Sequence, residues 1–192
     1  MRRILSVLAS CVALVAAPPL LAADDGTKAV APFASTPMWV VDEMLRLAEV
    51  KPADFVVDLG SGDGRLVLAA VESFGARSGF GVDIDASLVE YSNRKAVQDR
   101  VFDRAQFFVR DLFDTDLAQA TVVTVYLLPI AMDRLQRKLQ AELAPGTRVV
   151  SHDYPFTSWT PKRIVALDVP EKNDYTGRRS TALYLYVVPP RS

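Results

Sequence analysis

Apolar positions follow two different periods along the chain, and the change from one period to the other indicates where helices and strands lie. Residues 38–49 carry apolar side chains at helical spacing, whereas residues 55–59 form a short, continuous apolar run that glycine ends. Such a run is typical of a strand buried on both faces of a parallel sheet. The same alternation predicts further strands at 80–84, 105–109, 121–128 and 148–152, with helices at 67–74, 87–97 and 132–143.

The last two extended runs differ from the rest because no helix separates them. Residues 163–169 and 181–188 are joined by the polar segment 171–179, which predicts an antiparallel hairpin. The whole pattern predicts an α/β protein with a Rossmann-like, doubly wound sheet that is parallel except for this C-terminal hairpin. Ligands on such sheets bind beyond the carboxyl ends of the strands.

The N-terminus has the pattern of an export signal. Arg2 and Arg3 precede an apolar run, and small residues up to Ala23 precede Asp24. We therefore expect a signal peptide at 1–23, a flexible segment at 24–35 and one domain at 36–192, with the protein periplasmic or otherwise exported. The alternative is an uncleaved anchor, because residues 4–23 are long enough to cross a bilayer; only then is membrane contact expected.

Composition narrows the choice of partners and chemistry. The chain is 50% hydrophobic and 23% charged, as in ordinary globular proteins, and its 22 basic and 23 acidic residues give a net charge of −1. This balance lacks the basic footprint of nucleic-acid binders, so no nucleic-acid partner is expected. Cys11 and His152 are the only cysteine and histidine, too few for a Cys/His zinc site, and no metal is expected.

A glycine-spaced turn between the first strand and its helix is the most informative stretch. Gly60, Gly62 and Gly64 allow a tight turn and a close approach of a ligand to the backbone. Their G-x-G-x-G spacing differs from the G-x-G-x-x-G of dinucleotide-binding loops. Asp58, just before the turn, would repel a pyrophosphate and suits a cationic group. The pattern therefore favours a nucleoside that carries positive charge.

Two further acidic residues follow the next strands. Asp83 ends the second predicted strand, where a carboxylate can accept hydrogen bonds from both ribose hydroxyls. Asp111 follows the third strand, and with Leu112 and Phe113 it could hold an adenine amino group and ring face. Three successive strand ends thus offer three acceptors to one ligand.

The motifs D-L-G-S-G-D-G (58–64), G-V-D-I-D (81–85) and R-D-L-F (110–113) together resemble the cofactor motifs of class I S-adenosylmethionine-dependent methyltransferases. The resemblance extends from about Thr36 to the C-terminus and implies a seven-stranded sheet, with S-adenosyl-L-methionine as the cofactor. It places Asp58 and Gly60 near the methionine moiety, Asp83 on the ribose and Asp111 on the adenine. The full set of cofactor-binding residues that it implies is Asp58, Gly60, Ser61, Gly62, Gly64, Asp83, Ile84, Asp111 and Leu112.

More narrowly, the chain resembles the small lysine methyltransferases that modify the c subunit of mitochondrial ATP synthase. The likeness includes Y-L-L-P at 126–129 and Y-P-F at 154–156, and it implies Tyr126, Pro129 and Tyr154 as substrate-facing catalytic residues. The chain departs from that family by Asp83, where a glutamate is usual, and by its export signal. The predicted function is methyl transfer to protein lysine. The alternatives are a small-molecule methyltransferase or a non-catalytic extracytoplasmic binding protein with the same fold; the glycine spacing and Asp58 disfavour a nicotinamide-dependent oxidoreductase.

Several residues near these motifs have ordinary structural interpretations as well. Asp63 stands where a helix N-cap is expected, and Arg65 is expected to form an ion pair. His152 follows a strand end and could act as an acid or base, although a lone histidine is more often a hydrogen-bonded structural group. Trp159 could belong to the core or to a wall of the acceptor site.

Overall fold

The computed structural model describes residues 35–173 and 177–190, so the predicted signal peptide and, apart from Ser35, the predicted flexible segment lie outside it. The α-helices are α1 (Met38–Leu47), α2 (Arg65–Glu72), α3 (Ala86–Gln98) and α4 (Pro129–Glu142). The strands are β1 (Phe55–Leu59), β2 (Ser78–Asp83), β3 (Ala105–Val109), β4 (Val122–Val125), β5 (Arg148–His152), β6 (Arg163–Asp168) and β7 (Ser180–Val187). Two short 3-10 helices, η1 (Leu112–Asp114) and η2 (Pro170–Lys172), complete the described elements.

The strands form one seven-stranded sheet in the order β3-β2-β1-β4-β5-β7-β6. Strands β1 to β5 are parallel to one another, whereas β7 is antiparallel to both β5 and β6. This arrangement confirms the predicted doubly wound sheet with its C-terminal hairpin. The fourth strand is shorter than predicted and ends at Val125. Pro129 accounts for the early end, because it has no N–H for a sheet ladder and opens α4 instead.

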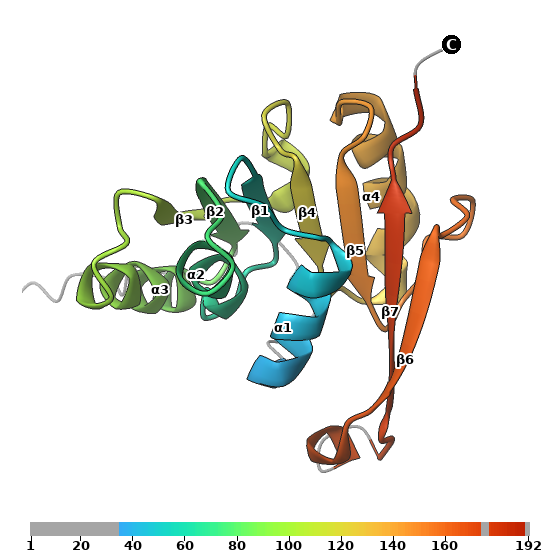
Figure 1. The fold of residues 1–192 in the computed structure, drawn as a ribbon, viewed down its shortest axis with the longest axis horizontal. Helices are drawn as coiled ribbons and strands as arrows, with labels where there is room; N and C mark the ends of the chain where they lie inside the picture. The colour runs from blue at the N-terminus through green and yellow to red at the C-terminus, as the bar shows by residue number, and fades with distance from the viewer. Residues whose placement is uncertain (1–34, 174–176, 191–192) are drawn as a thin grey trace, which may run out of the picture.

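Helices cover both faces of the sheet, with α1, α2 and α3 on one face and α4 on the other (Figure 1). Successive strand residues therefore enter different clusters: Val56 and Val122 pack with α1 and α2, whereas Val57 and Val123 pack with α4. All four valines are fully buried. Burying each such side chain contributes roughly 1.5–3 kcal/mol, so the continuous apolar runs of these strands are explained by burial on two faces.

The order of the strands creates a switch point between β1 and β4. The chain passes from β1 through β2 to β3 in one direction and then returns to place β4 on the other side of β1. Asp58 lies opposite Thr124 in the β1–β4 register. In doubly wound sheets, ligands bind at this point, outside the carboxyl ends of the strands. The topology therefore places Asp58 where a ligand is expected.

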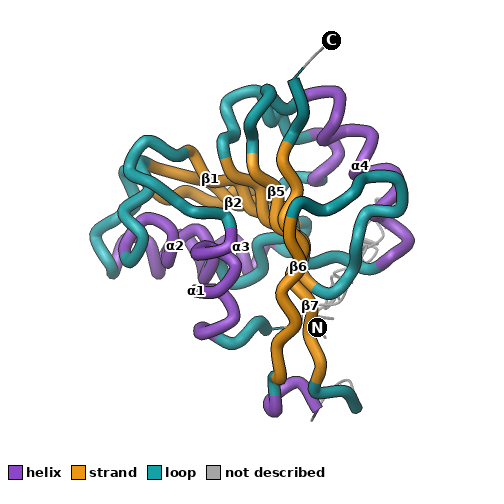
Figure 2. The backbone as a smooth tube through the Cα atoms, turned by 45° about the vertical axis from the view of Figure 1, so that its right-hand side comes forward, coloured by secondary structure: helices purple, strands orange, loops and turns teal. Residues whose placement is uncertain are grey.

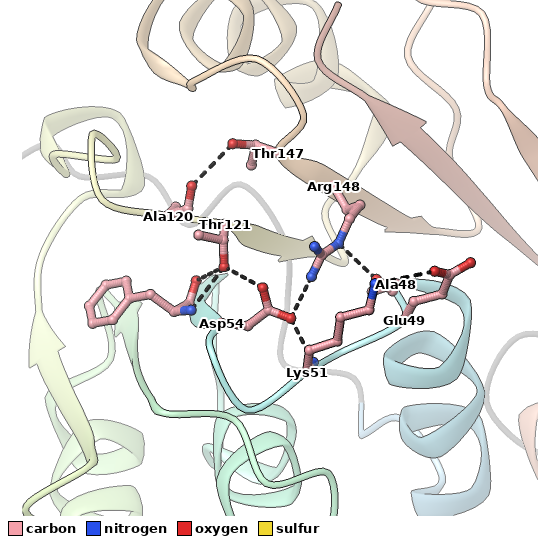
Figure 3. A network of polar contacts seen from close by, with 9 residues as sticks. Ala48, Glu49, Lys51, Asp54, Ala120, Thr121, Thr147 and Arg148 are labelled. Atoms are coloured by element: carbon pink, nitrogen blue, oxygen red, sulfur yellow. Dashed lines mark hydrogen bonds and ion pairs between the residues drawn. The ribbon is translucent and has the colours of Figure 1, made fainter.

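A polar network ties the amino ends of the same strands together (Figure 3). The buried carboxylate of Asp54 accepts hydrogen bonds from the Arg148 guanidinium at 2.5 Å, from the Thr121 hydroxyl at 2.8 Å and from the Lys51 backbone N–H at 2.6 Å. Arg148 also donates to the carbonyl of Ala48 at 2.9 Å. This end of the sheet is cross-linked internally, which leaves the carboxyl ends as the place for a ligand.

The β6–β7 hairpin projects beyond the carboxyl-end edge of the neighbouring strands (Figure 2). Its pairing runs from Arg163 opposite Leu185 to Asp168 opposite Ser180, and η2 follows β6 at the projecting end. None of the helices in the described part of the chain has the length and apolar character needed to cross a bilayer.

Candidate active site

The glycine turn has the backbone conformation that its sequence predicts. Gly60, Gly62 and Gly64 all have left-handed φ angles, of 84°, 53° and 79°. A Cβ atom at Gly64 would lie 2.7 Å from the ring of Phe107, closer than real contacts allow. The backbone N–H groups of Gly60 and Ser61 both donate to the carbonyl of Val82 at 2.9 Å, which anchors the turn to β2. The turn is therefore rigid and presents backbone where side chains would otherwise stand.

Asp58 is buried, and its carboxylate makes one hydrogen bond with another side chain. Its side chain accepts a hydrogen bond from the Thr124 hydroxyl at 2.7 Å, and the residue is 4% exposed. Burial, against the opposing hydrogen bond from Thr124 and with smaller contributions from the charges of Asp83 and Asp63, raises the pKa of Asp58 to about 7. Within the described residues, no lysine or arginine lies within ion-pair distance of Asp58. A cationic ligand would therefore stabilise the ionised form of this carboxylate.

Asp83 joins the glycine turn to the next helix. Its Oδ2 accepts a hydrogen bond from the backbone N–H of Gly62 at 2.8 Å, and its Oδ1 accepts one from the N–H of Asp85 at 3.0 Å. A carboxylate has about four acceptor positions, so two more donors, such as a pair of ribose hydroxyls, can bind. Ile84 follows directly and is 37% exposed. Both residues lie at the carboxyl end of β2, as the sequence predicts.

Asp111 lies beyond β3, which ends at Val109, and it caps η1. Its Oδ1 accepts a hydrogen bond from the Phe113 N–H at 2.8 Å. The neighbouring Leu112 is only 6% exposed and packs in the core on the α4 side of the sheet. Of these two predicted contacts, Asp111 offers a polar side chain, whereas the side chain of Leu112 has little surface for a ligand.

The substrate-facing residues predicted from the family resemblance lie near the ends of β4 and β5. Tyr126 follows β4, and its hydroxyl donates to Oδ2 of Asp153 at 3.1 Å. Its ring lies 4.0 Å from the ring of His152, measured between centroids. Pro129 is the first residue of α4 and is exposed, and Tyr154 is half-buried two residues after β5. The structure brings Tyr126 and the end of β5 together and leaves Pro129 at the surface.

Two functional candidates escaped prediction from the sequence. Asp153 contacts Tyr126, and Lys172 of η2 donates to the same Asp153 oxygen at 2.5 Å. Asp153 also has a left-handed φ of 66°, which is uncommon for a residue other than glycine. The adjacent histidine could have drawn attention to Asp153, but nothing in the sequence links Lys172 to it across the hairpin.

Only two buried side-chain polar atoms in the described part of the chain have no hydrogen-bond partner. They are Oγ of Ser61 in the glycine turn and Nε2 of His152 at the end of β5. Buried polar atoms without a partner are rare in native proteins and call for an explanation such as a ligand. Both atoms belong to residues near the carboxyl-end edge of the sheet, where the predicted site residues lie.

Asp63, Arg65 and Trp159 lie beside the site and make local contacts. The N-cap of α2 is Gly64 and not Asp63, and no side chain caps this helix. The carboxylate of Asp63 instead pairs with Arg65, accepting from its Nε at 2.7 Å and from its backbone N–H at 3.4 Å. The ion pair expected of Arg65 is therefore present. Trp159 packs in the core, 5.6 Å from the ring of Phe156, in agreement with the core interpretation.

Comparison with known proteins places the chain in a family. The sequence model of the ANTKMT methyltransferase domain matches residues 58–163. A protein-lysine N-methyltransferase of Saccharolobus islandicus (strain REY15A) is 36% identical over 157 residues, which cover 82% of this chain and 93% of that protein. The lysine N-methyltransferase of Rattus norvegicus that is named for the c subunit of ATP synthase is 34% identical over 70% of this chain and 61% of its own length.

A solved structure supports the same placement. The crystal structure of an RNA methyltransferase from Salinibacter ruber, in complex with S-adenosyl-L-homocysteine, has a TM-score of 0.74 and 41% sequence identity with this chain. The match covers 83% of this chain and 96% of that one. Since the family model spans more than half of the 192 residues and the Saccharolobus islandicus relative aligns over 82% of the chain, the chain belongs to the ANTKMT methyltransferase domain family.

Proposed function

We propose that this protein transfers the methyl group of S-adenosyl-L-methionine to the side-chain nitrogen of lysine in a protein. The observation that carries the cofactor part of the proposal is Asp58, a buried carboxylate at the β1–β4 switch point with no cationic partner among the described residues. It is supported by the relatives whose names specify lysine as the acceptor. The chain is a methyltransferase by family, so the proposal concerns mainly the acceptor.

The residues at the carboxyl-end edge fit this cofactor. Asp58 would bind its cationic methionine end, where the positive charge offsets the burial of the carboxylate. Asp83 has acceptor positions left for the ribose hydroxyls, and Asp111 would accept from the adenine amino group. The glycine turn provides room for close approach, and Ser61 Oγ would gain the partner that it lacks. When bound, the cofactor supplies a methyl group activated by its sulfonium.

The protein then has to align the acceptor and bind it as a neutral amine. A free lysine has a reference pKa near ~10.4, so most of it is protonated at neutral pH. Aromatic surroundings such as the rings of Tyr126 and His152 disfavour the ammonium form by desolvation. The amine nitrogen forms its bond to the methyl carbon while the carbon–sulfur bond breaks, the electron pair stays on sulfur, and the product ammonium loses a proton to water. Alignment is the main contribution of the protein.

The proposal is tested with the purified protein, cofactor labelled in its methyl group and an extract of cells that lack the gene. We expect label in protein, recovered as Nε-methyllysine after acid hydrolysis. Asp58→Asn should abolish labelling. Asp54→Asn is the matched control, because it changes a buried aspartate at the opposite end of β1 and should leave labelling intact. Absence of labelled lysine with the wild-type protein would overturn the proposal.

RNA is the second candidate acceptor, because the Salinibacter ruber structure is described as an RNA methyltransferase. The net charge of −1 argues against it, since proteins that bind RNA commonly carry a basic surface. The labelling experiment separates the two acceptors: label that ribonuclease removes and protease leaves would identify RNA. Label in neither polymer would favour a small-molecule acceptor, and no transfer at all would favour a non-catalytic binding protein.

We also propose that the protein is exported, on the evidence of Arg2, Arg3 and the apolar run that follows. Protein recovered from the periplasm should begin at Asp24. A full-length chain that begins at Met1 and stays with the cytoplasmic fraction would contradict this proposal. A full-length chain in the membrane fraction would indicate the uncleaved anchor.

A further inference from the structure

A cluster of four residues lies where the β6–β7 hairpin meets the ends of β4 and β5. We refer to Tyr126, His152, Asp153 and Lys172 as the Asp153 cluster. Asp153 is its centre: Oδ2 accepts hydrogen bonds from the Tyr126 hydroxyl at 3.1 Å and from Nζ of Lys172 at 2.5 Å, and lies 3.9 Å from Nε2 of His152. The side chain of Asp153 is 11% exposed. One carboxylate oxygen thus joins three segments that are distant in the sequence.

The backbone of Asp153 is held in an uncommon conformation. Its φ of 66° is left-handed, and its N–H donates to the carbonyl of Ala182 in β7 at 2.7 Å. Such a conformation is unfavourable in a residue other than glycine and persists only when its surroundings enforce it. In this conformation the carboxylate accepts the hydrogen bond from the Tyr126 hydroxyl.

Lys172 is unusual because lysine is seldom buried, and this residue is 6% exposed. Besides Asp153, its Nζ donates to the carbonyl of Ser180 and to the hydroxyl of Thr181, both at 2.9 Å. The ammonium balances the charge of the Asp153 carboxylate and connects it to the first two residues of β7. A hairpin that needed only to be attached to the sheet could do so with apolar contacts, which avoid the desolvation of two charges.

His152 supplies an independent sign that this place faces a ligand. Burial lowers the pKa of His152 to about 4; the charge of Asp153 opposes this shift and that of Lys172 adds to it. The imidazole is therefore neutral at pH 7, and one of its nitrogens, Nε2, is buried without a hydrogen-bond partner. Nδ1 lies 3.5 Å from the hydroxyl of Thr36. A buried nitrogen left without a partner beside the Asp153 carboxylate fits a site that a polar substrate group completes.

We propose that Asp153 and Lys172 are positioning residues for the acceptor lysine, acting through the hydroxyl of Tyr126. This inference rests on the proposed function. Lys172 holds the Asp153 carboxylate in place, and this carboxylate accepts a hydrogen bond from the Tyr126 hydroxyl. A phenol oxygen that donates its hydrogen can still accept a hydrogen bond. It accepts one from an N–H of the neutral substrate amine and so directs the nitrogen lone pair toward the methyl carbon.

Without Asp153, the Tyr126 hydroxyl would be able to turn its hydrogen toward the amine nitrogen and occupy the lone pair that attacks. The Asp153 cluster therefore makes the substrate amine the donor, and the Tyr126 oxygen the acceptor, of their hydrogen bond. The reverse direction would lower the rate of methyl transfer and leave the affinity for cofactor unchanged. The alternative is that Lys172 and Asp153 merely attach the hairpin.

The test is a set of kinetic measurements on the full-length protein with a protein acceptor. Asp153→Asn keeps the shape of the side chain and suits the left-handed backbone. It removes the charge that pairs with the Lys172 ammonium, so the amide oxygen is no longer fixed toward the Tyr126 hydroxyl. Asp153→Asn and Tyr126→Phe should each lower kcat roughly tenfold, the effect of about one hydrogen bond lost in the transition state. The cofactor Kd, measured by calorimetry, should change less than twofold. The double variant should be no slower than the slower single variant, because both changes break one and the same connection.

Two further variants separate positioning from attachment. Lys172→Met should lower kcat like Asp153→Asn, and Lys172→Arg should restore part of it, because arginine can still pair with Asp153. Asp168→Asn breaks the exposed ion pair between Asp168 and Arg179 in the same hairpin and serves as the control; its kcat should equal that of the wild type. If Asp153→Asn fails to fold, the kcat values of Tyr126→Phe, Lys172→Met and Lys172→Arg distinguish positioning from attachment.

The results can contradict this inference without touching the proposed function. If the wild-type protein labels lysine but Tyr126→Phe and Asp153→Asn leave kcat unchanged, the Asp153 cluster has no positioning role. The same conclusion follows if the two effects multiply in the double variant or if Asp168→Asn is as slow as Lys172→Met. If the wild-type protein labels no lysine at all, the proposed function itself fails.

Discussion

Replacing Asp58 by asparagine should make the ligand-free protein progressively more stable relative to the wild type as pH rises, while removing its function. The folded-state pKa of Asp58 is about 7, against a reference value of 3.8, because burial disfavours the charged form. The folded protein therefore holds a proton that the unfolded chain has lost between these two values. Stability falls as pH rises through this window and is level above it. At 1.36 kcal/mol per pKa unit, the free energy of unfolding is lower by about 2 kcal/mol at pH 5 and by about 4 kcal/mol at pH 8 than at a pH below both pKa values.

Asparagine has nearly the same shape, does not ionise and can still accept the hydrogen bond from Thr124. Its amide hydrogens lower the free energy of unfolding by an amount that does not depend on pH. The quantity to measure is therefore the free energy of unfolding of the variant minus that of the wild type, from urea denaturation at pH 5 and pH 8 without ligand. This difference should shift by about 2–3 kcal/mol in favour of the variant between the two pH values.

The reasoning is wrong if the difference is independent of pH, or if it shifts in favour of the wild type as pH rises. A second requirement is that calorimetry finds at least tenfold weaker binding of cofactor to Asp58→Asn, because the cationic end of the ligand loses its counter-charge. A variant that is more stable at pH 8 and still binds normally would show that Asp58 is buried for another reason.

Three further predictions concern the same edge of the sheet and its opposite end. Cofactor should bind the wild type about tenfold more tightly at pH 8 than at pH 6, as ionisation of Asp58 with a pKa of about 7 requires; an equal pH dependence in Asp58→Asn would contradict this. Asp54→Ala should destabilise the fold by about 2–4 kcal/mol in urea denaturation, because Arg148 loses its carboxylate, yet leave the cofactor Kd within twofold; a large loss of affinity would refute the separation of the two ends. Gly64→Ala should destabilise by about 2–4 kcal/mol, since it combines a left-handed φ with a clash against Phe107; an unchanged urea midpoint would show that the turn can move.

The pattern of apolar residues was enough to predict the order and type of the elements. The continuous apolar run at 55–59 indicates a strand with two buried faces, and the structure places it inside the sheet, between β2 and β4. The hairpin followed from two extended runs without a helix between them. The predictions were least accurate at boundaries. Residues 126–128 continue the apolar run of β4 but leave the strand, because Pro129 opens α4.

Local motifs also determined much of the candidate site. Asp58, Asp83 and Asp111 follow or end successive strands, and parallel strands bring their carboxyl ends to one edge, so their proximity could be inferred without coordinates. The error at Asp63 has a local cause as well. The sequence suggests that Asp63 is the N-cap of α2, but Gly64 occupies the N-cap position. The Asp63 carboxylate instead pairs with the side chain of Arg65, two residues along the chain.

By itself, then, the sequence determined the fold class, the positions of the acidic residues and the cofactor motifs, because all of these depend on short-range periodicity and spacing. The tertiary structure alone decided what surrounds each group. It buries Asp58, which raises its pKa, and leaves a nitrogen of His152 without a partner. It also brings Lys172 to Asp153 across the hairpin. Burial and long-range pairing depend on how distant segments pack, and no pattern within one segment contains that information.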